Sequence, residues 1–239
     1  MKKLHVKGAI ISNADKEAYN FYNVDSTSPN DIASQLIDGE DIEVVINSNG
    51  GNVFAGSEIY TMLKEHTGQV IAKITAMAAS SASIIAMGAD RVLMSPTSQM
   101  MIHNVSVKSG GDYRDMEHTA EVLKSANSTI ANAYRIKTGL SEEELLAMMD
   151  RETWLSPQRA VELGFADEMM FENKPNEDEL ELVASATSET VTLPKEVINK
   201  YFELNNSLPS ENTQVDFLMQ KNKLSAQLKL IKLKGEIKS

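Results

Sequence analysis

The 239-residue sequence contains no cysteine, which excludes disulfide bonds, cysteine-based zinc sites and thiol nucleophiles. Any nucleophile must therefore be a serine, threonine, lysine or carboxylate. Long apolar runs are also lacking, so neither a membrane-spanning helix nor a secretory signal is expected. Basic side chains are few, 23 against 34 acidic ones, and the net charge of −11 argues against a surface for nucleic-acid phosphates. We expect a cytoplasmic protein that binds neither nucleic acid nor membrane.

The composition changes near position 171 and marks a domain boundary. Eleven of the twelve glycines precede this point, and the sequence beyond it is first acidic and then rich in serine and threonine. Phe217, Leu224 and Ile231 then recur at seven-residue spacing among lysines. The sequence therefore predicts a folded domain over 1–171, a polar linker with short ordered pieces over 172–215, and a basic amphipathic helix over 216–239.

Strand and helix signals alternate through the first 171 residues, which favours an α/β layered domain. Ser28-Pro29 indicates the start of a helix, with a serine cap and proline in the first turn. A short β-branched strand over 42–46 leads into a predicted glycine-rich turn over 47–52. A long helix is expected over 112–137, ended by Gly139, and a capping box at Ser141 opens the next helix.

Three serines follow a predicted strand and open a helix of small residues: Ser80, Ser81 and Ser83. A hydroxyl at such a junction lies beside backbone N–H groups that lack intrahelical partners, where an oxyanion is well stabilised. Serine is also a favoured helix cap, so the local sequence does not separate a nucleophile from a cap.

Of the four histidines, only His103 ends a hydrophobic strand next to a loop. His5, His66 and His118 lie in polar surroundings and are expected at the surface. A serine nucleophile needs such a base, and the base needs an acid to hold its tautomer. Asp167, which follows a helix and its Gly164 cap, is our candidate for the acid, with Asp150 in reserve. These residues predict a Ser/His/Asp hydrolase without metal or cofactor.

Several ordered blocks resemble the signatures of the Clp-type serine peptidases over roughly residues 4–171. The blocks are Ile46-Asn47-Ser48-Asn49-Gly50-Gly51, Ala78-Ala79-Ser80, Met101-Ile102-His103 and Ala160-Val161-Glu162-Leu163-Gly164-Phe165-Ala166-Asp167. Two further blocks, over 80–87 and 152–156, look most like the phage-encoded head maturation branch. The resemblance implies a crotonase-like ββα superhelix of the α/β class with a C-terminal helical extension.

The resemblance also assigns roles to residues. It implies Ser80 as the nucleophile, His103 as the base and Asp167 as the acid. The N–H groups of Gly51 and Ser81 would form the oxyanion hole. A peptide substrate would lie as an added strand along Asn52, Val53, Asn104 and Val105. Asn49 replaces a proline that the family commonly has, although the glycines of the turn are intact.

The resemblance further implies a homo-oligomeric ring, heptameric or doubled, that acts on peptides or proteins. An AAA+ unfoldase or a capsid or scaffold protein is a possible partner. The chain begins almost at the first core strand, so the pore-lining N-terminal segment of housekeeping relatives is expected to be missing or very short. Two alternatives remain: a catalytically silent ring-forming module, and a crotonase-type acyl-CoA enzyme.

Overall fold

The computed structural model describes residues 1–172 and 200–201. The chain divides into two compact units, Met1–Asn13 with Ser26–Glu179, and Ala14–Asp25 with Leu180–Ser239. The helix predicted over 216–239 lies outside the described residues, as does nearly all of the linker predicted over 172–215. Within the described part of the chain, no helix is long and apolar enough to span a membrane.

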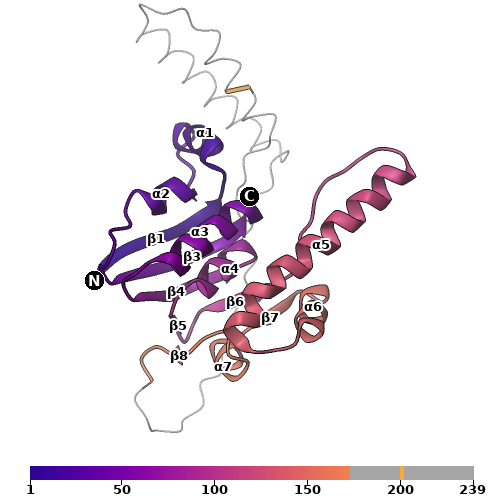
Figure 1. The fold of residues 1–239 in the computed structure, drawn as a ribbon. Coiled ribbons are helices and arrows are strands. Elements are labelled where there is room, and N and C mark those ends of the chain that lie inside the picture. The colour runs from indigo at the N-terminus through magenta and orange to yellow at the C-terminus, as the bar shows by residue number, and fades with distance from the viewer. Residues whose placement is uncertain (173–199, 202–239) are drawn as a thin grey trace, which may run out of the picture. The chain divides into compact units, whose positions relative to one another are not determined.

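The first unit is built on one largely parallel sheet (Figure 1). Its main strand order is β2-β1-β3-β4-β5-β8, and β6 pairs with β4 and with β7. All of these pairings are parallel except that of β6 with β7. The strands are β1 (Lys2–Ile10), β2 (Ser26–Thr27), β3 (Ile42–Gly51), β4 (Val70–Ala79), β5 (Arg91–Met94), β6 (Gln99–Ile102), β7 (Thr153–Leu155) and β8 (Glu168–Met169).

Alternation along the strands directs one face of the sheet into the core. Val6 of β1, Val44 of β3 and Ala72 of β4 are fully buried, whereas the intervening His5 and Lys73 are more accessible. α3 (Val53–Glu65) and α4 (Ser81–Met87) contact the strands of this sheet. Every residue of α4 is buried, as its run of small and apolar side chains predicts.

The helices begin where the sequence provides caps. α2 (Pro29–Ala33) begins after Ser28 with a capping box, and α6 (Glu142–Asp150) begins in the same way after Ser141. α5 (Tyr113–Thr138) ends at Gly139, which has φ +75°. These three boundaries confirm the predictions from the sequence.

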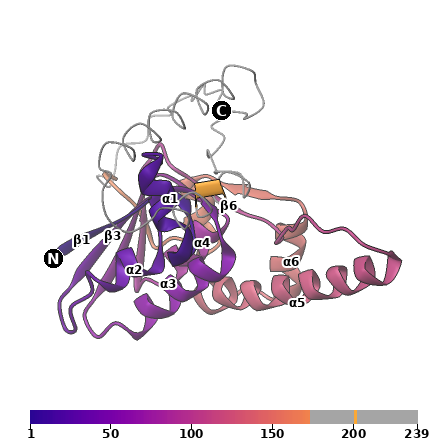
Figure 2. The same ribbon diagram turned by 90° about the horizontal axis from the view of Figure 1, so that it is seen from above.

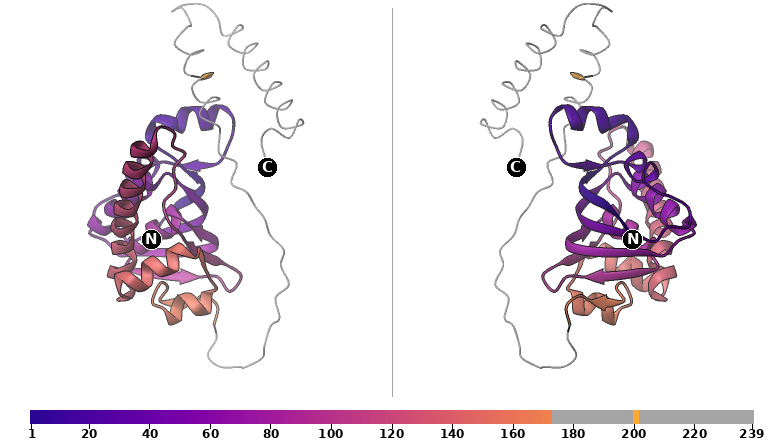
Figure 3. Two further views of the ribbon diagram at one scale, coloured as in Figure 1. Left: turned by 90° about the vertical axis from the view of Figure 1, so that its right-hand side faces the viewer. Right: turned by 90° about the vertical axis from the view of Figure 1, so that its left-hand side faces the viewer.

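α5 has two halves with different surroundings. Its buried residues, which run from Ile130 to Tyr134, all belong to the C-terminal half, whereas the N-terminal half is mostly exposed. The N-terminal half extends beyond the sheet (Figures 1 and 2). α6, β7 and α7 (Pro157–Glu162) follow α5 and lie together beside its C-terminal half (Figures 1 and 3).

The glycine-rich segment over 47–52 differs from the expected turn. β3 continues through it to Gly51, and Gly50 and Gly51 pair with Ala9 and Ile10 of β1 after a register shift. The turn prediction was therefore wrong, because pairing with β1 keeps the segment extended. Gly50 and Gly51 therefore form the end of a strand that contains a β-bulge.

The described part of the second unit contains α1 (Lys16–Phe21), preceded by the 3₁₀ turn η1 (Asn13–Asp15) that spans the boundary between the units. The rings of Phe21 and Tyr201 lie with their centroids 5.1 Å apart. Burial and the neighbouring Glu17 carboxylate raise the pKa of Tyr201 to about 12, which keeps this phenol neutral.

Candidate active site

Ser80 lies between the end of β4 and the first residue of α4, in a backbone conformation that non-glycine residues rarely adopt. Its φ is 54° and its ψ is −127°. The Ser80 N–H donates to the Met101 carbonyl of β6 at 2.9 Å, which ties this corner to the neighbouring strand. Unfavourable backbone geometry of this kind is often found at functional sites.

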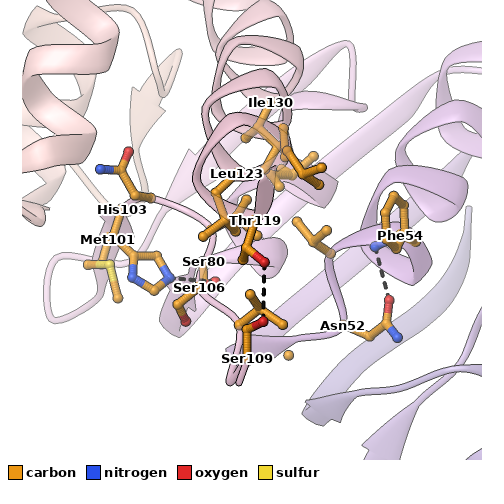
Figure 4. Close-up of a pocket in the computed structure, with 18 of the residues that line it drawn as sticks. Asn52, Phe54, Ser80, Met101, His103, Ser106, Ser109, Thr119, Leu123 and Ile130 are labelled. Atoms are coloured by element: carbon orange, nitrogen blue, oxygen red, sulfur yellow. Dashed lines mark hydrogen bonds between the residues drawn. The ribbon is translucent and has the colours of Figure 1, made fainter. Parts of the chain in front are cut away.

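His103 directly follows β6 and faces Ser80. Ala79 and Met101 are register partners across β4 and β6, so Ser80 and His103 project from the carboxyl ends of adjacent strands. The His103 Nε2 lies 2.8 Å from the Ser80 Oγ (Figure 4). With the imidazole proton on Nδ1, Nε2 accepts the hydroxyl proton, which is the arrangement that activates a serine.

The other two serines at this junction face the interior. Ser81 and Ser83 are fully buried. The Ser83 hydroxyl donates to the Ser80 carbonyl at 2.6 Å and is hydrogen-bonded to the Tyr134 hydroxyl at 2.8 Å. Among the described residues, the Ser81 hydroxyl has no hydrogen-bond partner. Of the three candidates, only Ser80 is hydrogen-bonded to His103.

Gly50, near the end of β3, packs against the Ser80 corner, whereas the close neighbour of Gly51 is the backbone of Ile10. A Cβ on Gly50 would lie 2.6 Å from the Ala79 carbonyl oxygen and 2.7 Å from the Ser80 Cβ, and φ at Gly50 is +93°. The Gly50 N–H donates to the Ser48 hydroxyl oxygen at 3.0 Å. Gly51 is exposed and lines the same cavity as Ser80.

A cavity of about 660 Å³ opens beside Ser80 and is lined by β3, the start of α3, the segment after β6, and α5 (Figure 4). One end carries the strongly exposed ring of Phe54. Most of the remaining wall is apolar. The apolar side chains from α4, β6 and α5 are Ile84, Met101, Val122, Leu123, Ala126 and Ile130.

All four residues expected along a bound peptide line this cavity, but two of their N–H groups are already used. The Asn52 N–H donates to the Ile10 carbonyl at 2.7 Å, and the Val105 N–H donates to the Asn127 side chain at 2.8 Å. Val53 is the first residue of α3. An added strand would therefore have to pair through other backbone groups of this rim.

Asp167 is not beside His103. Its Oδ2 accepts from the Val92 N–H at 2.6 Å and from the Lys137 ammonium at 2.7 Å. Val92 pairs with Ala72, eight residues before Ser80 on β4. At about 3.3 Å per residue, Asp167 is roughly 25 Å from the nucleophile, at the opposite end of the sheet. This geometry corrects the expectation that Asp167 orients His103.

Two other carboxylates lie closer to the histidine. Asp150, the reserve candidate, accepts from the Asn104 amide at 2.7 Å and so reaches only the neighbour of His103. Glu152, the first residue of the block over 152–156, is a carboxylate to which the sequence pattern assigns no role. Ile102 and Thr153 are the last antiparallel partners of β6 and β7. His103 directly follows Ile102 and Glu152 directly precedes Thr153, so both residues lie at the same end of this strand pair. Predicting that β6 and β7 pair antiparallel, although α5 and α6 lie between them in the chain, would have indicated this residue.

Glu152 has φ 49°, a second unusual backbone conformation beside the site. Its carboxylate accepts from the Trp154 indole N–H at 3.2 Å and is exposed. Among the residues that the structure describes, the His103 side chain makes one hydrogen bond, to Ser80. Glu152 thus lies at the end of the strand pair that His103 follows, with its carboxylate bound to Trp154.

The other histidines differ from one another. His5 and His118 are exposed, as expected, whereas His66 is partly buried and is hydrogen-bonded to the Glu40 carbonyl at 2.7 Å. Although His118 lines the cavity, it belongs to the exposed half of α5.

Similarity to known proteins agrees with this geometry. The model of the family described as Clp protease matches residues 20–173. The ATP-dependent Clp protease proteolytic subunit of Deinococcus radiodurans is 30% identical over 161 residues, 64% of this chain and 79% of that protein. Subunit 1 of Chlamydia abortus is 34% identical over 138 residues, 56% of this chain and 71% of that protein. A Bacteroides fragilis subunit is 31% identical over 155 residues, 62% of this chain and 75% of that protein.

The mostly parallel sheet with its covering helices is consistent with the crotonase-like ββα fold that the sequence blocks imply. The matched region contains the strand ends that carry Ser80 and His103, and all of α5. The chain therefore belongs to the Clp protease family and is a serine-type endopeptidase of the Clp kind.

Proposed function

We propose that this chain hydrolyses peptide bonds with Ser80 as the nucleophile and His103 as the general base. The hydrogen bond of 2.8 Å between the Ser80 Oγ and the His103 Nε2 carries this proposal. His103 takes the hydroxyl proton as Ser80 attacks the scissile carbonyl, and then donates it to the leaving amine. A water molecule, activated in the same way, hydrolyses the acyl-enzyme and regenerates Ser80.

The N–H groups of Gly51 and Ser81 are the proposed oxyanion donors. Gly51 lines the cavity beside Ser80, and Ser81 supplies the first N–H of α4, which has no acceptor one turn earlier in the helix. The close packing of Gly50 against the Ser80 corner, where a Cβ would lie 3.0 Å from the Ser81 nitrogen, supports this pairing of donors, because Gly50 directly precedes Gly51. Two aligned N–H donors stabilise the tetrahedral intermediate more than the ground-state carbonyl.

Glu152 is the proposed orienting acid, in place of Asp167. Glu152 and His103 flank the last antiparallel pair of β6 and β7, and a rotation of the Glu152 side chain away from Trp154 would turn its carboxylate toward the His103 Nδ1. Glutamate holds the histidine tautomer as aspartate does in other serine hydrolases.

Replacement of the nucleophile tests the central assignment. Ser80→Ala should abolish peptide cleavage and labelling by a fluorophosphonate. Ser106→Ala is the matched control, because Ser106 is an exposed serine that lines the same cavity. Undiminished labelling of Ser80→Ala would refute the assignment. If folded wild-type protein is not labelled by a fluorophosphonate and cleaves no peptide, the alternative of a catalytically silent ring-forming module is favoured.

The choice of acid has its own test. Glu152→Gln should lower kcat by about 10²- to 10⁴-fold, because a neutral amide cannot hold the imidazolium. Asp150→Asn should change kcat little, since Asp150 contacts Asn104 rather than the imidazole. Equal activity of Glu152→Gln and the wild type would contradict the role of Glu152.

The cavity supports a peptide substrate with an apolar side chain near the scissile bond. The part of the cavity wall formed by Leu123, Ala126 and Ile130 of α5 is apolar and carries no charged side chain. A set of fluorogenic peptides that differ only at the residue before the cleaved bond should rank leucine or methionine above aspartate and lysine. The acyl-CoA alternative is not favoured, because it gives the Ser80–His103 pair no role.

A cytoplasmic homo-oligomeric ring, fed by an AAA+ unfoldase or acting on capsid proteins, completes the proposal. Exposed apolar side chains on the projecting half of α5, among them Tyr113 and Met116, support contact with another copy of the chain. Native mass spectrometry would give the number of subunits. Co-expression with a phage capsid precursor, with Ser80→Ala as control, would test the head-maturation role.

A further inference from the structure

A chain of buried hydrogen bonds connects α5 to the backbone of Ser80. The Ser83 hydroxyl donates to the Ser80 carbonyl oxygen at 2.6 Å. Because a serine has one hydroxyl proton, the Ser83 oxygen must then accept the bond of 2.8 Å from the Tyr134 hydroxyl. Ser83 is fully buried and Tyr134 is 1% exposed.

Stability alone does not explain why these two hydroxyls are present. Replacing both partners of a buried hydrogen bond by apolar groups of similar shape is often nearly neutral, so alanine and phenylalanine would serve the core. Burial also raises the pKa of Tyr134 above the ordinary value for a phenol, so the group remains a neutral donor throughout the working pH range.

The acceptor at the end of this chain belongs to the peptide unit that contains a proposed oxyanion donor. The Ser80 carbonyl and the Ser81 N–H are two ends of one planar peptide group and point in opposite directions. A hydrogen bond that fixes the carbonyl therefore also fixes the direction of the N–H. The Ser80 ψ of −127°, which sets the orientation of this plane, occurs with an unfavourable φ of 54° and needs such an anchor.

The same helix that supplies Tyr134 also forms the cavity wall. Leu123, Ala126 and Ile130 line the cavity, and Tyr134 follows one turn after Ile130. The position of α5 and the orientation of the Ser81 N–H are thus linked through two hydrogen bonds.

We propose that Ser83 and Tyr134 are positioning residues that aim the Ser81 N–H at the oxyanion through the Ser80 carbonyl. This inference rests on the proposed function of Ser80. Both residues are buried, and although Tyr134 lines the cavity, its hydroxyl is bound to Ser83. Their hydrogen bonds hold the donor in the direction needed in the transition state, so that no reorientation is required during the reaction.

The experiment compares Ser83→Ala, Tyr134→Phe and the double variant with Ser98→Ala. Ser98 is the matched control: it is buried, and its hydroxyl and N–H donate to the carbonyl three residues earlier, at 2.8 and 2.9 Å, as those of Ser83 do. Removal of a whole oxyanion donor lowers kcat by about 10²- to 10³-fold, and the Ser83 N–H still binds the Ser80 carbonyl at 3.0 Å. We therefore expect a fall of about tenfold for Ser83→Ala and of several-fold for Tyr134→Phe.

Three readouts separate positioning from a structural effect. The values of KM should stay within about twofold of wild type, because the N–H direction matters mainly in the transition state. Affinity for a peptide boronate, which places an oxygen in the oxyanion hole, should fall with kcat. The double variant should lose about as much as Ser83→Ala, because the two residues act through one hydrogen bond.

The outcomes are distinct. If wild-type protein neither cleaves peptides nor labels, the proposed function fails. If it is active and folded Ser83→Ala and Tyr134→Phe match Ser98→Ala in kcat and boronate affinity, the positioning role is overturned. Thermal melting establishes which variants are folded, and Tyr134→Phe, which removes a single oxygen atom, decides the question if Ser83→Ala does not fold.

Discussion

Replacing Gly50 by alanine should both slow catalysis and destabilise the fold, because the added methyl group meets the Ser80 corner. The alanine Cβ would lie 2.6 Å from the Ala79 carbonyl oxygen and 2.7 Å from the Ser80 Cβ. Real Cβ atoms approach no closer than about 3.0 Å, so the Ser80 corner must move by a few tenths of an ångström. The positive φ of +93° adds backbone strain of about 1–2 kcal/mol, and overpacking adds about 1–3 kcal/mol.

The free energy of unfolding should thus fall by about 2–5 kcal/mol, which urea titration measures. The displaced nucleophile should react with a fluorophosphonate about tenfold more slowly, because a misplacement of about 1 Å costs about 100-fold and this displacement is smaller. Gly139→Ala is the matched control: φ is +75° and no atom lies within 4 Å of the added Cβ. It should lose only about 1 kcal/mol and label normally. Wild-type labelling of Gly50→Ala would refute the role of this contact.

Two further predictions concern charges far from the nucleophile. Asp167→Asn should lower the free energy of unfolding by about 1–2 kcal/mol, because the ion pair with Lys137 is lost. The rate of fluorophosphonate labelling should not change. A large loss of labelling in folded Asp167→Asn protein would show that Asp167 takes part in catalysis. The hydrogen bond from Lys73 holds the pKa of Glu43 below its ordinary value of 4.5, so its contribution to stability is complete above that pH and is lost as the pH falls through the lower folded value. Urea titrations between pH 3 and 7 should show less decline at low pH in Glu43→Gln than in the wild type.

Features encoded within a few residues could be predicted from the sequence. The serine that caps α2, the capping box of α6 and the glycine that ends α5 each satisfy backbone groups locally, so their positions follow from residue type and spacing. The ordered blocks around Ser80 and His103 also indicated the family, and the structure brings these two side chains within hydrogen-bond distance.

Features that depend on strand pairing were harder to predict. The segment ending in Gly51 has the composition of a turn, yet β1 pairs with it and keeps it extended. Asp167 follows a helix and a glycine, which is equally typical of a catalytic loop and of a structural one. Only its place beside β5, at the end of the sheet away from Ser80, shows which it is.

By itself, the sequence determined the α/β class, the family, and Ser80 and His103 as residues of the site, because each depends on patterns within short stretches of contiguous residues. The tertiary structure alone brought Glu152 and His103 to one end of the β6–β7 strand pair and joined Tyr134 to Ser83 across 51 positions. The physical reason is that strand register and the packing of α5 are set by contacts between distant segments, and no local pattern encodes the distance between their side chains.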